Sequence, residues 1–108
     1  MAQQASDRLL YTLDTITQKV PPTSGTYEVF SRAECMYVGE SDDVCAELLA
    51  MYYEDRPCLN ERDFTHFLFT VAPPDLREAH RIDRIRELAP LCNLRKGSEQ
   101  CGHCRLGQ

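Results

Sequence analysis

Two tyrosines, Tyr27 and Tyr37, occupy successive short apolar runs of the sequence. A phenol whose pKa is lowered by a charged site can orient or deprotonate an attacking water molecule. The same pair is equally suited to packing its rings on neighbouring strands, with the hydroxyls at the edge of a sheet. From the residues alone, packing is the favoured interpretation.

A carboxylate and several arginines fall on one segment expected to be helical, residues 75–88. Glu78 shares a helical stripe with Ile82 and Ile85, so its carboxylate is expected to point toward the apolar face. Carboxylates there are uncommon unless they are paired or bind a metal. The alternative is a capping box with Asp75, in which Glu78 bonds to a backbone N–H at the start of the helix.

The arginines of the same segment are the candidate phosphate contacts, because cationic side chains neutralise nucleic-acid phosphates. An arginine cluster on a short helix is more often a solvated face. The candidates are Arg77, Arg81 and Arg84, with Arg86 further along the helix.

Metal-ligand side chains gather near the C-terminal end. Their number and types fit a tetrahedral zinc site that would fasten the tail to the last helix. The alternatives are free thiols and, less favoured, disulfide exchange, which needs the two cysteines at a helix N-terminus. The candidate zinc ligands are Cys92, Cys101, His103 and Cys104. The other cysteines are predicted to be buried thiols: Cys35, Cys45 and Cys58.

The length of 108 residues, with 43% hydrophobic and 27% charged residues, predicts one globular domain over residues 1–94 and a polar tail over 95–108. Residues 1–76 hold 5 basic and 13 acidic side chains, and residues 77–108 hold 7 and 4. This balance weakens a nucleic-acid function without excluding it. No apolar run could span a membrane and no signal peptide is recognisable, so a cytoplasmic protein is predicted.

The elements that must position these side chains follow from periodicity. Apolar residues at helical spacing predict an N-terminal helix over 6–20, capped by Ser6, that packs on the core or on a protein partner. Strands are predicted over 26–30, 35–38 and 64–72, and a helix from the cap Ser41 to about Tyr53. With the helix over 75–88, the pattern is that of an α+β fold built on a small sheet.

Two tripeptides, Gly25-Thr26-Tyr27 and Tyr37-Val38-Gly39, resemble the signature of the GIY-YIG nucleases. The likeness includes the order of the predicted strands and helices over residues 20–93 and ends with Pro90 and Asn93. The resemblance implies a three-stranded antiparallel sheet flanked by helices, here with an added N-terminal helix. It further implies DNA phosphodiester hydrolysis with one divalent cation, Mg²⁺ or Mn²⁺.

Carried over residue by residue, the resemblance assigns Tyr27 and Tyr37 to catalysis, Glu78 to the metal and Asn93 to the terminal asparagine. Counting back from Pro90 instead places Arg81 at the metal position, which would remove the metal ligand.

The family's arginine position holds Glu47, whose carboxylate would repel a phosphate. An active site would therefore need a substitute such as Arg32, Arg81 or Arg84. The sequence predicts a weak or inactive nuclease, and the alternative is a non-catalytic module that binds protein or nucleic acid, with zinc as a possible stabiliser.

Overall fold

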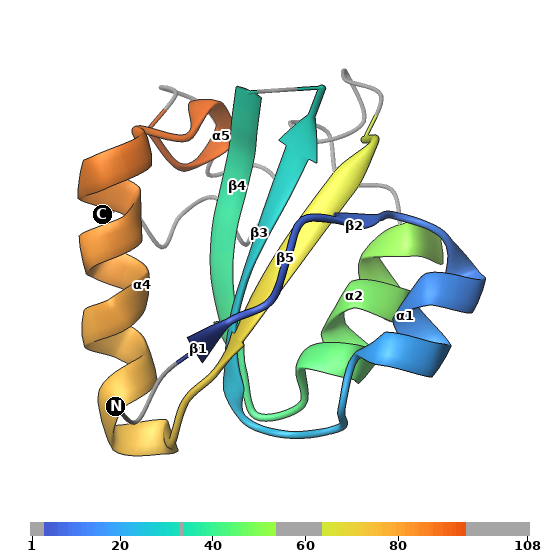
Figure 1. Cartoon of the computed structure of the whole chain (residues 1–108). Coiled ribbons are helices and arrows are strands. Elements are labelled where there is room, and N and C mark those ends of the chain that lie inside the picture. Colours follow the sequence, from blue (N-terminus) through green and yellow to red (C-terminus); the bar gives the residue numbers. More distant parts are fainter. Residues whose placement is uncertain (1–3, 33, 54–63, 95–108) are drawn as a thin grey trace.

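The computed structural model describes residues 4–32, 34–53 and 64–94, which form an antiparallel sheet with helices on both faces (Figure 1). Three long strands build the sheet in the order β5-β3-β4. They are β3 (Gly25–Ser31), β4 (Glu34–Ser41) and β5 (His66–Val71). Two short strands, β1 (Gln4–Ala5) and β2 (Leu9–Leu10), pair with the outer side of β5. The predicted α+β class and its three-stranded antiparallel core are confirmed, and two short strands are added.

Helices α1 (Leu13–Lys19) and α2 (Val44–Tyr53) cover one face of the sheet, and α4 (Pro74–Leu88) covers the other (Figure 1). Helix α4 ends where Ala89 takes a left-handed conformation (φ 47°) ahead of Pro90, because neither residue continues a helix. The short α5 (Leu91–Leu94) then packs against the edge strand β4. Among the described residues, no helix has the length and apolar character needed to cross a membrane.

The N-terminal helix is shorter than predicted. Leu9 and Leu10 form β2, and the Tyr11 N–H donates to the Thr65 carbonyl. The helix starts only after Thr12, whose hydroxyl accepts the N–H of Thr15 at 3.2 Å. Ser6 therefore caps no helix. The helical spacing of the apolar residues was misleading here, because pairing with β5 satisfies the backbone of residues 9–11.

The cap of α2 also differs from the prediction. Ser41 is the last residue of β4 and pairs with Gly25, while the Asp43 carboxylate accepts the N–H of Ala46 at 2.9 Å. An acidic side chain at this place also complements the positive end of the helix dipole. The chain thus passes from strand to helix within two residues.

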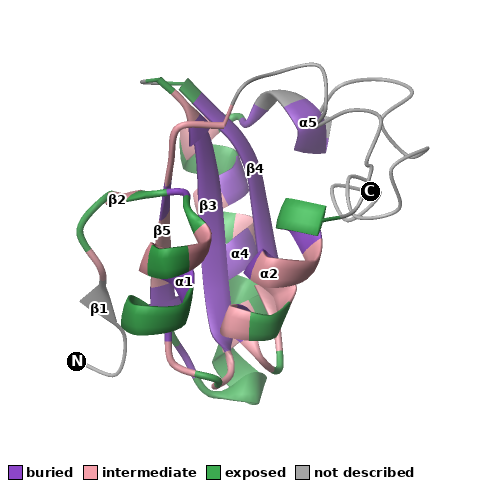
Figure 2. Cartoon of the chain, turned by 90° about the vertical axis from the view of Figure 1, so that its right-hand side faces the viewer, coloured by how far each residue is buried: buried purple, intermediate pink, exposed green. Residues whose placement is uncertain are grey.

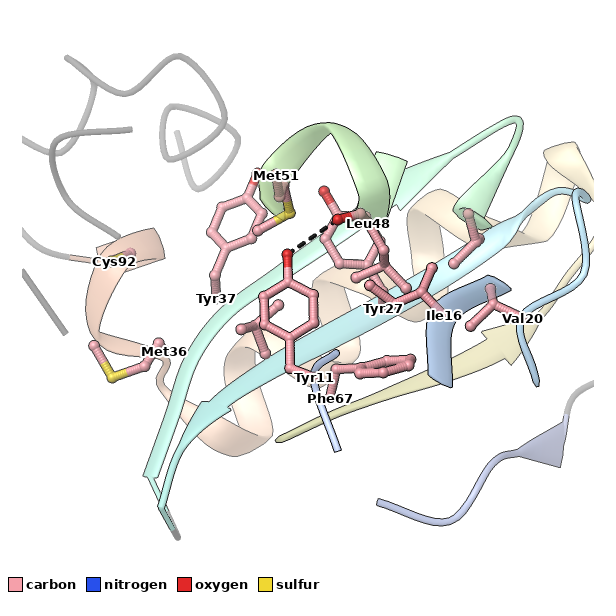
Figure 3. Packing of buried hydrophobic residues seen from close by; sticks show 12 residues of the cluster. Tyr11, Ile16, Val20, Tyr27, Met36, Tyr37, Leu48, Met51, Phe67 and Cys92 are labelled. Atoms are coloured by element: carbon pink, nitrogen blue, oxygen red, sulfur yellow. Dashed lines mark hydrogen bonds between the residues drawn. The ribbon is translucent and has the colours of Figure 1, made fainter. Parts of the chain in front are cut away.

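Strands β3 and β4 are buried along most of their length (Figure 2). Because side chains alternate across a sheet, Tyr27 faces α1 and α2 while Glu28 faces α4. A large cluster fills the α1–α2 side (Figure 3) and includes Ile16, Tyr27, Tyr37, Leu48 and Phe67. A smaller cluster lies under α4: Phe30, Cys35, Val38 and Ile85.

Candidate functional site

The two predicted tyrosines meet on adjacent strands. The ring centroids of Tyr27 in β3 and Tyr37 in β4 lie 6.1 Å apart, and the rings are tilted by 46°. Gly39 pairs with Tyr27 across the hairpin, and a Cβ at Gly39 would lie 2.4 Å from the Tyr27 Cζ and hydroxyl. The absent side chain therefore makes room for the Tyr27 ring. Both rings are buried, with 1% and 0% exposure.

Glu47 lies beside this pair on the first turn of α2. The Tyr27 hydroxyl donates to the Glu47 Oε2 at 3.4 Å. Glu47 is half-buried, so its carboxylate faces the tyrosine from the margin of the helix. The Tyr27 hydroxyl is thus oriented toward a carboxylate by a hydrogen bond, and a negative charge at this position disfavours an approaching phosphate.

Glu78 lies away from the apolar face. It is exposed, and α4 begins after Pro73 with no side-chain capping bond. The expected orientation toward the core and the expected capping box are therefore both wrong. The buried face of α4 instead carries Arg81 and Ile85, so the helix is rotated relative to the stripe through Ile82.

The three arginines predicted to contact phosphates are ion-paired with acidic residues. Arg81 Nε donates to Glu40 at 2.8 Å, and Arg77 Nε donates to the other oxygen of Glu40 at 2.9 Å. Arg77 also bonds Asp42, which raises the pKa of Arg77 through hydrogen bonding. These two guanidinium groups are therefore already paired with carboxylates, which compete with any phosphate for them.

Arg84 pairs with the most buried carboxylate of this group, Glu28. Its Nε and Nη2 donate to the two oxygens of Glu28 at 2.6 and 3.0 Å, and hydrogen bonding to Glu28 raises the pKa of Arg84. Glu28 has 1% of its side chain exposed. Arg32, the other candidate substitute, is exposed in the β3–β4 turn. Its position beyond Ser31 puts it at the opposite end of the hairpin from Gly39.

Asn93 is buried and joins α5 to the edge strand. Its Oδ1 accepts the Val38 N–H at 2.7 Å, and its Nδ2 donates to the Val38 carbonyl at 3.1 Å. The carboxamide thus satisfies the backbone groups that Val38 directs away from β3. The side chain that the resemblance assigned to the site holds α5 against β4.

The fold can now be compared with known structures. Solved structures that resemble it include three point mutants of the GIY-YIG N-terminal endonuclease domain of UvrC from Thermotoga maritima, each bound to its catalytic divalent cation. The TM-score is 0.55 for each. This chain has a GIY-YIG fold. The sequence identity is 13%, 14% and 16%, so the likeness concerns the fold alone.

The GIY-YIG likeness covers most of both molecules. It spans 71–72% of this chain and 88–90% of the UvrC domains. No protein-family model and no curated protein sequence matches the chain. The relationship is therefore visible in the structure and in the short motifs around Tyr27 and Tyr37.

The described part of this GIY-YIG fold gathers no cluster of metal-ligating side chains. Across residues 4–32, 34–53 and 64–94, no group of three His, Cys, Asp or Glu side chains could hold a metal ion. Glu78 is exposed, and Arg81 is buried in an ion pair with Glu40. A guanidinium there opposes a second positive charge.

The predicted zinc site lies largely outside the described residues. Three of its ligands belong to that part of the chain: Cys101, His103 and Cys104. Cys92 is buried and takes part in a disulfide, which leaves no thiolate for zinc. Among the scattered cysteines, Cys35 is a buried free thiol, as predicted, Cys45 is half-buried, and Cys58 lies outside the described residues.

Two carboxylates that organise the α4 side of the GIY-YIG fold were missed from the sequence, Glu28 and Glu40. Glu28 interrupts an apolar strand between Tyr27 and Val29, and Glu40 follows Gly39 near the end of β4. A charged residue at a core-facing strand position needs a partner, which was the available signal. The arginine-rich segment supplied that partner.

Proposed function

We propose that this chain is a GIY-YIG-fold domain with weak or no phosphodiester hydrolysis, which acts through what it binds. The observation that supports this most directly is the contact between Tyr27 and Glu47. The resemblance calls for an arginine at this position, whereas the Glu47 carboxylate bonds a tyrosine that, in a nuclease, would have to orient the attacking water near the phosphate. The pairing of Arg77, Arg81 and Arg84 with acids supports the same conclusion.

The residues of this proposed site divide into two groups. Tyr27 and Tyr37 lie side by side, so the scaffold of the hairpin is retained. The charged groups expected to bind phosphate and metal differ from those that the resemblance calls for. Glu47 is acidic where an arginine is expected, Glu78 is exposed, and Arg81 is buried. Electrostatic stabilisation of the transition state is usually the largest contribution to such catalysis.

The second candidate function is DNA hydrolysis supported by Mg²⁺ or Mn²⁺. The GIY-YIG fold and the adjacent tyrosines favour it, since the similar UvrC domains are endonucleases bound to a catalytic divalent cation. In this proposal Tyr27 and Tyr37 would orient the attacking water, Glu78 would hold the cation and Asn93 would keep α5 in place. An arginine would have to enter the site from elsewhere.

Nicking of supercoiled plasmid in Mg²⁺ or Mn²⁺ distinguishes the two proposals. The wild type is compared with Glu78→Ala and Tyr27→Phe, each prepared by the same procedure so that a contaminating nuclease appears equally in all three. We expect the same background from every sample. Cleavage by the wild type that disappears in both variants would establish the second candidate and overturn the first.

A gain-of-function variant tests the role of Glu47. Because Glu47 is half-buried at the margin of α2, Glu47→Arg is expected to fold and to place a cation beside Tyr27. We expect tighter binding of a short DNA duplex at low salt than the wild type shows. Asp14→Arg on the exposed side of α1 is the control with the same change of charge. An equal gain in both variants would mean that only net charge matters.

A further inference from the structure

Helix α2 has an apolar surface on the side turned away from the sheet. Glu47 is the only charged residue between Val44 and Tyr53. The buried residues of the helix, including Leu48 and Met51, face the sheet. Cys45 and Leu49 are partly buried against the same core cluster, and the other apolar residues form the α2 outer face: Ala46, Ala50, Tyr52 and Tyr53. A helix that is apolar on all sides is normally covered on all sides.

Exposure of this face is concentrated in its two aromatic rings. Tyr52 is 46% exposed and Tyr53 is 72% exposed, and the C-terminal end of α2 is coloured as exposed (Figure 2). Ala50, one turn before Tyr53, is half-buried, and Ala46, two turns before Tyr53, is exposed. Ala46 and Ala50 therefore form a surface of short side chains along α2, and the ring of Tyr53 lies at its C-terminal end.

The two rings are held in place by the core. Tyr53 lies edge-on to Tyr52, with centroids 5.6 Å apart, and Tyr52 lies edge-on to Tyr11 at 5.8 Å. Tyr11 is itself fixed, because its hydroxyl donates to the Leu48 carbonyl at 3.0 Å (Figure 3). Rings that are already ordered lose little conformational freedom on binding. Exposed, ordered tyrosines are typical of protein contact surfaces.

The charges around the face indicate what it binds. Asp43 lies at the start of α2 and Glu47 beside the face, while Lys19 is the only basic residue in α1 or α2. An acidic rim repels nucleic acid, and it repels the same rim of a second copy of the chain. It attracts a segment that combines apolar anchors with lysine or arginine.

We propose that the α2 outer face is a docking site for a basic amphipathic segment of a partner protein. The apolar side chains of the segment pack on Ala46, Ala50 and Tyr53, and its basic side chains lie near Asp43 and Glu47. This inference deepens the proposed function, since a domain with no hydrolytic activity acts through its partners. The plasmid assay and the assay below nevertheless fail independently, because α2 keeps its outer face whether or not DNA is cleaved.

A library of random 16-residue peptides displayed on phage tests the proposal. Peptides are selected on the full-length wild type and their affinities are measured as synthetic peptides by fluorescence anisotropy. We expect enriched peptides to be net positive, with apolar residues at spacings of three and four. Tyr53→Ala is expected to weaken them at least tenfold, because aromatic anchors dominate such interfaces. Ala46→Lys is expected to weaken binding of these peptides more than Tyr53→Ala does, because the lysine is larger than alanine and repels the basic side chains of the peptide.

Leu76→Ala is the matched control, because Leu76 is also an exposed apolar residue, at 40%, but lies on α4 on the opposite face of the sheet. Circular dichroism checks that each variant is folded. The proposal is overturned if no peptide is enriched, if the enriched peptides are acidic or neutral, or if Tyr53→Ala and Leu76→Ala have equal effects. Concentration-dependent dimerisation that Ala46→Lys abolishes would assign the face to a second copy and overturn it as well.

Discussion

The carboxamide of Asn93 contacts Val38 as a neighbouring strand would. It accepts the Val38 N–H and donates to the Val38 carbonyl, although 55 positions separate the two residues in the chain. Among the described strands β4 is an edge of the sheet, so none of them pairs with these backbone groups on that side. The amide therefore closes the edge at one point and attaches the end of the domain to the Tyr37 strand.

Removing this amide is expected to destabilise the domain. Asn93→Ala leaves the buried N–H and carbonyl of Val38 without their partner, and each unsatisfied group costs free energy. We expect the free energy of unfolding to fall by about 2–4 kcal/mol, measured by urea denaturation. Gln18→Ala removes an exposed amide from α1 and should change it by less than about 0.5 kcal/mol. Equal effects would show that the Asn93 contact contributes nothing of its own.

Gly39 and Gly25 are expected to resist substitution for different reasons. A Cβ at Gly39 would meet the Tyr27 ring, whereas a Cβ at Gly25 would lie 2.3 Å from the backbone oxygen of Thr70. Each alanine is expected to lower stability by about 1–3 kcal/mol through overpacking.

A second substitution separates these two causes. Tyr27→Leu removes the ring that Gly39→Ala would meet, so it should reduce the cost of Gly39→Ala. It should leave the cost of Gly25→Ala unchanged, since the obstacle there is backbone. Thermal unfolding of the single and double variants gives the coupling. A cost of Gly39→Ala that persists beside Tyr27→Leu would contradict the steric explanation.

The order of the long elements could be predicted because each carries its own local signal. Alternating apolar residues identified the strand after Thr65, and Pro73 and Pro90 bounded the long helix. The N-terminal segment could not be predicted in the same way. Leu9 and Leu13 have helical spacing, yet Leu9 pairs with Phe67, and such a contact between distant parts of the chain leaves no local pattern.

The candidate site was predictable where the motifs are short and contiguous. The motifs located Tyr27 and Tyr37 correctly on neighbouring strands, and counting from Tyr37 identified Glu47. The partners of the arginines were not predictable, because Glu28 and Arg84 are 56 positions apart and meet only when α4 crosses the sheet. Glu78 is exposed in the orientation of α4 in which Arg81 and Arg84 reach Glu40 and Glu28.

The ion pair between Glu28 and Arg84 is expected to fix the placement of α4. Arg84→Met leaves the Glu28 carboxylate buried without its counter-charge, and removal of one partner from a buried pair is strongly destabilising. We expect a loss of about 3 kcal/mol, at the low end of the usual range because 26% of the Arg84 side chain is exposed. Urea denaturation measures it.

The double variant Glu28→Leu with Arg84→Met supplies the comparison. It removes both charges, so no unpaired carboxylate remains, and it should be more stable than Arg84→Met alone. Arg86→Met on the exposed side of the same helix is the control for loss of an arginine. If Arg84→Met and Arg86→Met were equally stable, Glu28 would not depend on its partner.

The buried thiol of Cys35 is expected to make stability fall at alkaline pH. Burial, together with the nearby charge of Glu28, raises the pKa of Cys35 from 9.0 to about 12. Above about pH 9 the unfolded chain therefore releases this proton while the folded chain retains it, so the unfolded state is favoured as pH rises. The contribution is fully present below pH 9 and is lost progressively toward pH 12, by at most about 1.4 kcal/mol per pH unit. Urea denaturation of the wild type and Cys35→Ala between pH 7 and pH 10.5 isolates this effect, because every other side chain is the same in both proteins. We expect the difference in the free energy of unfolding between the wild type and Cys35→Ala to be constant up to pH 9 and to shrink above it. A constant difference over the whole range would mean that the thiol ionises equally easily in the folded and unfolded chain.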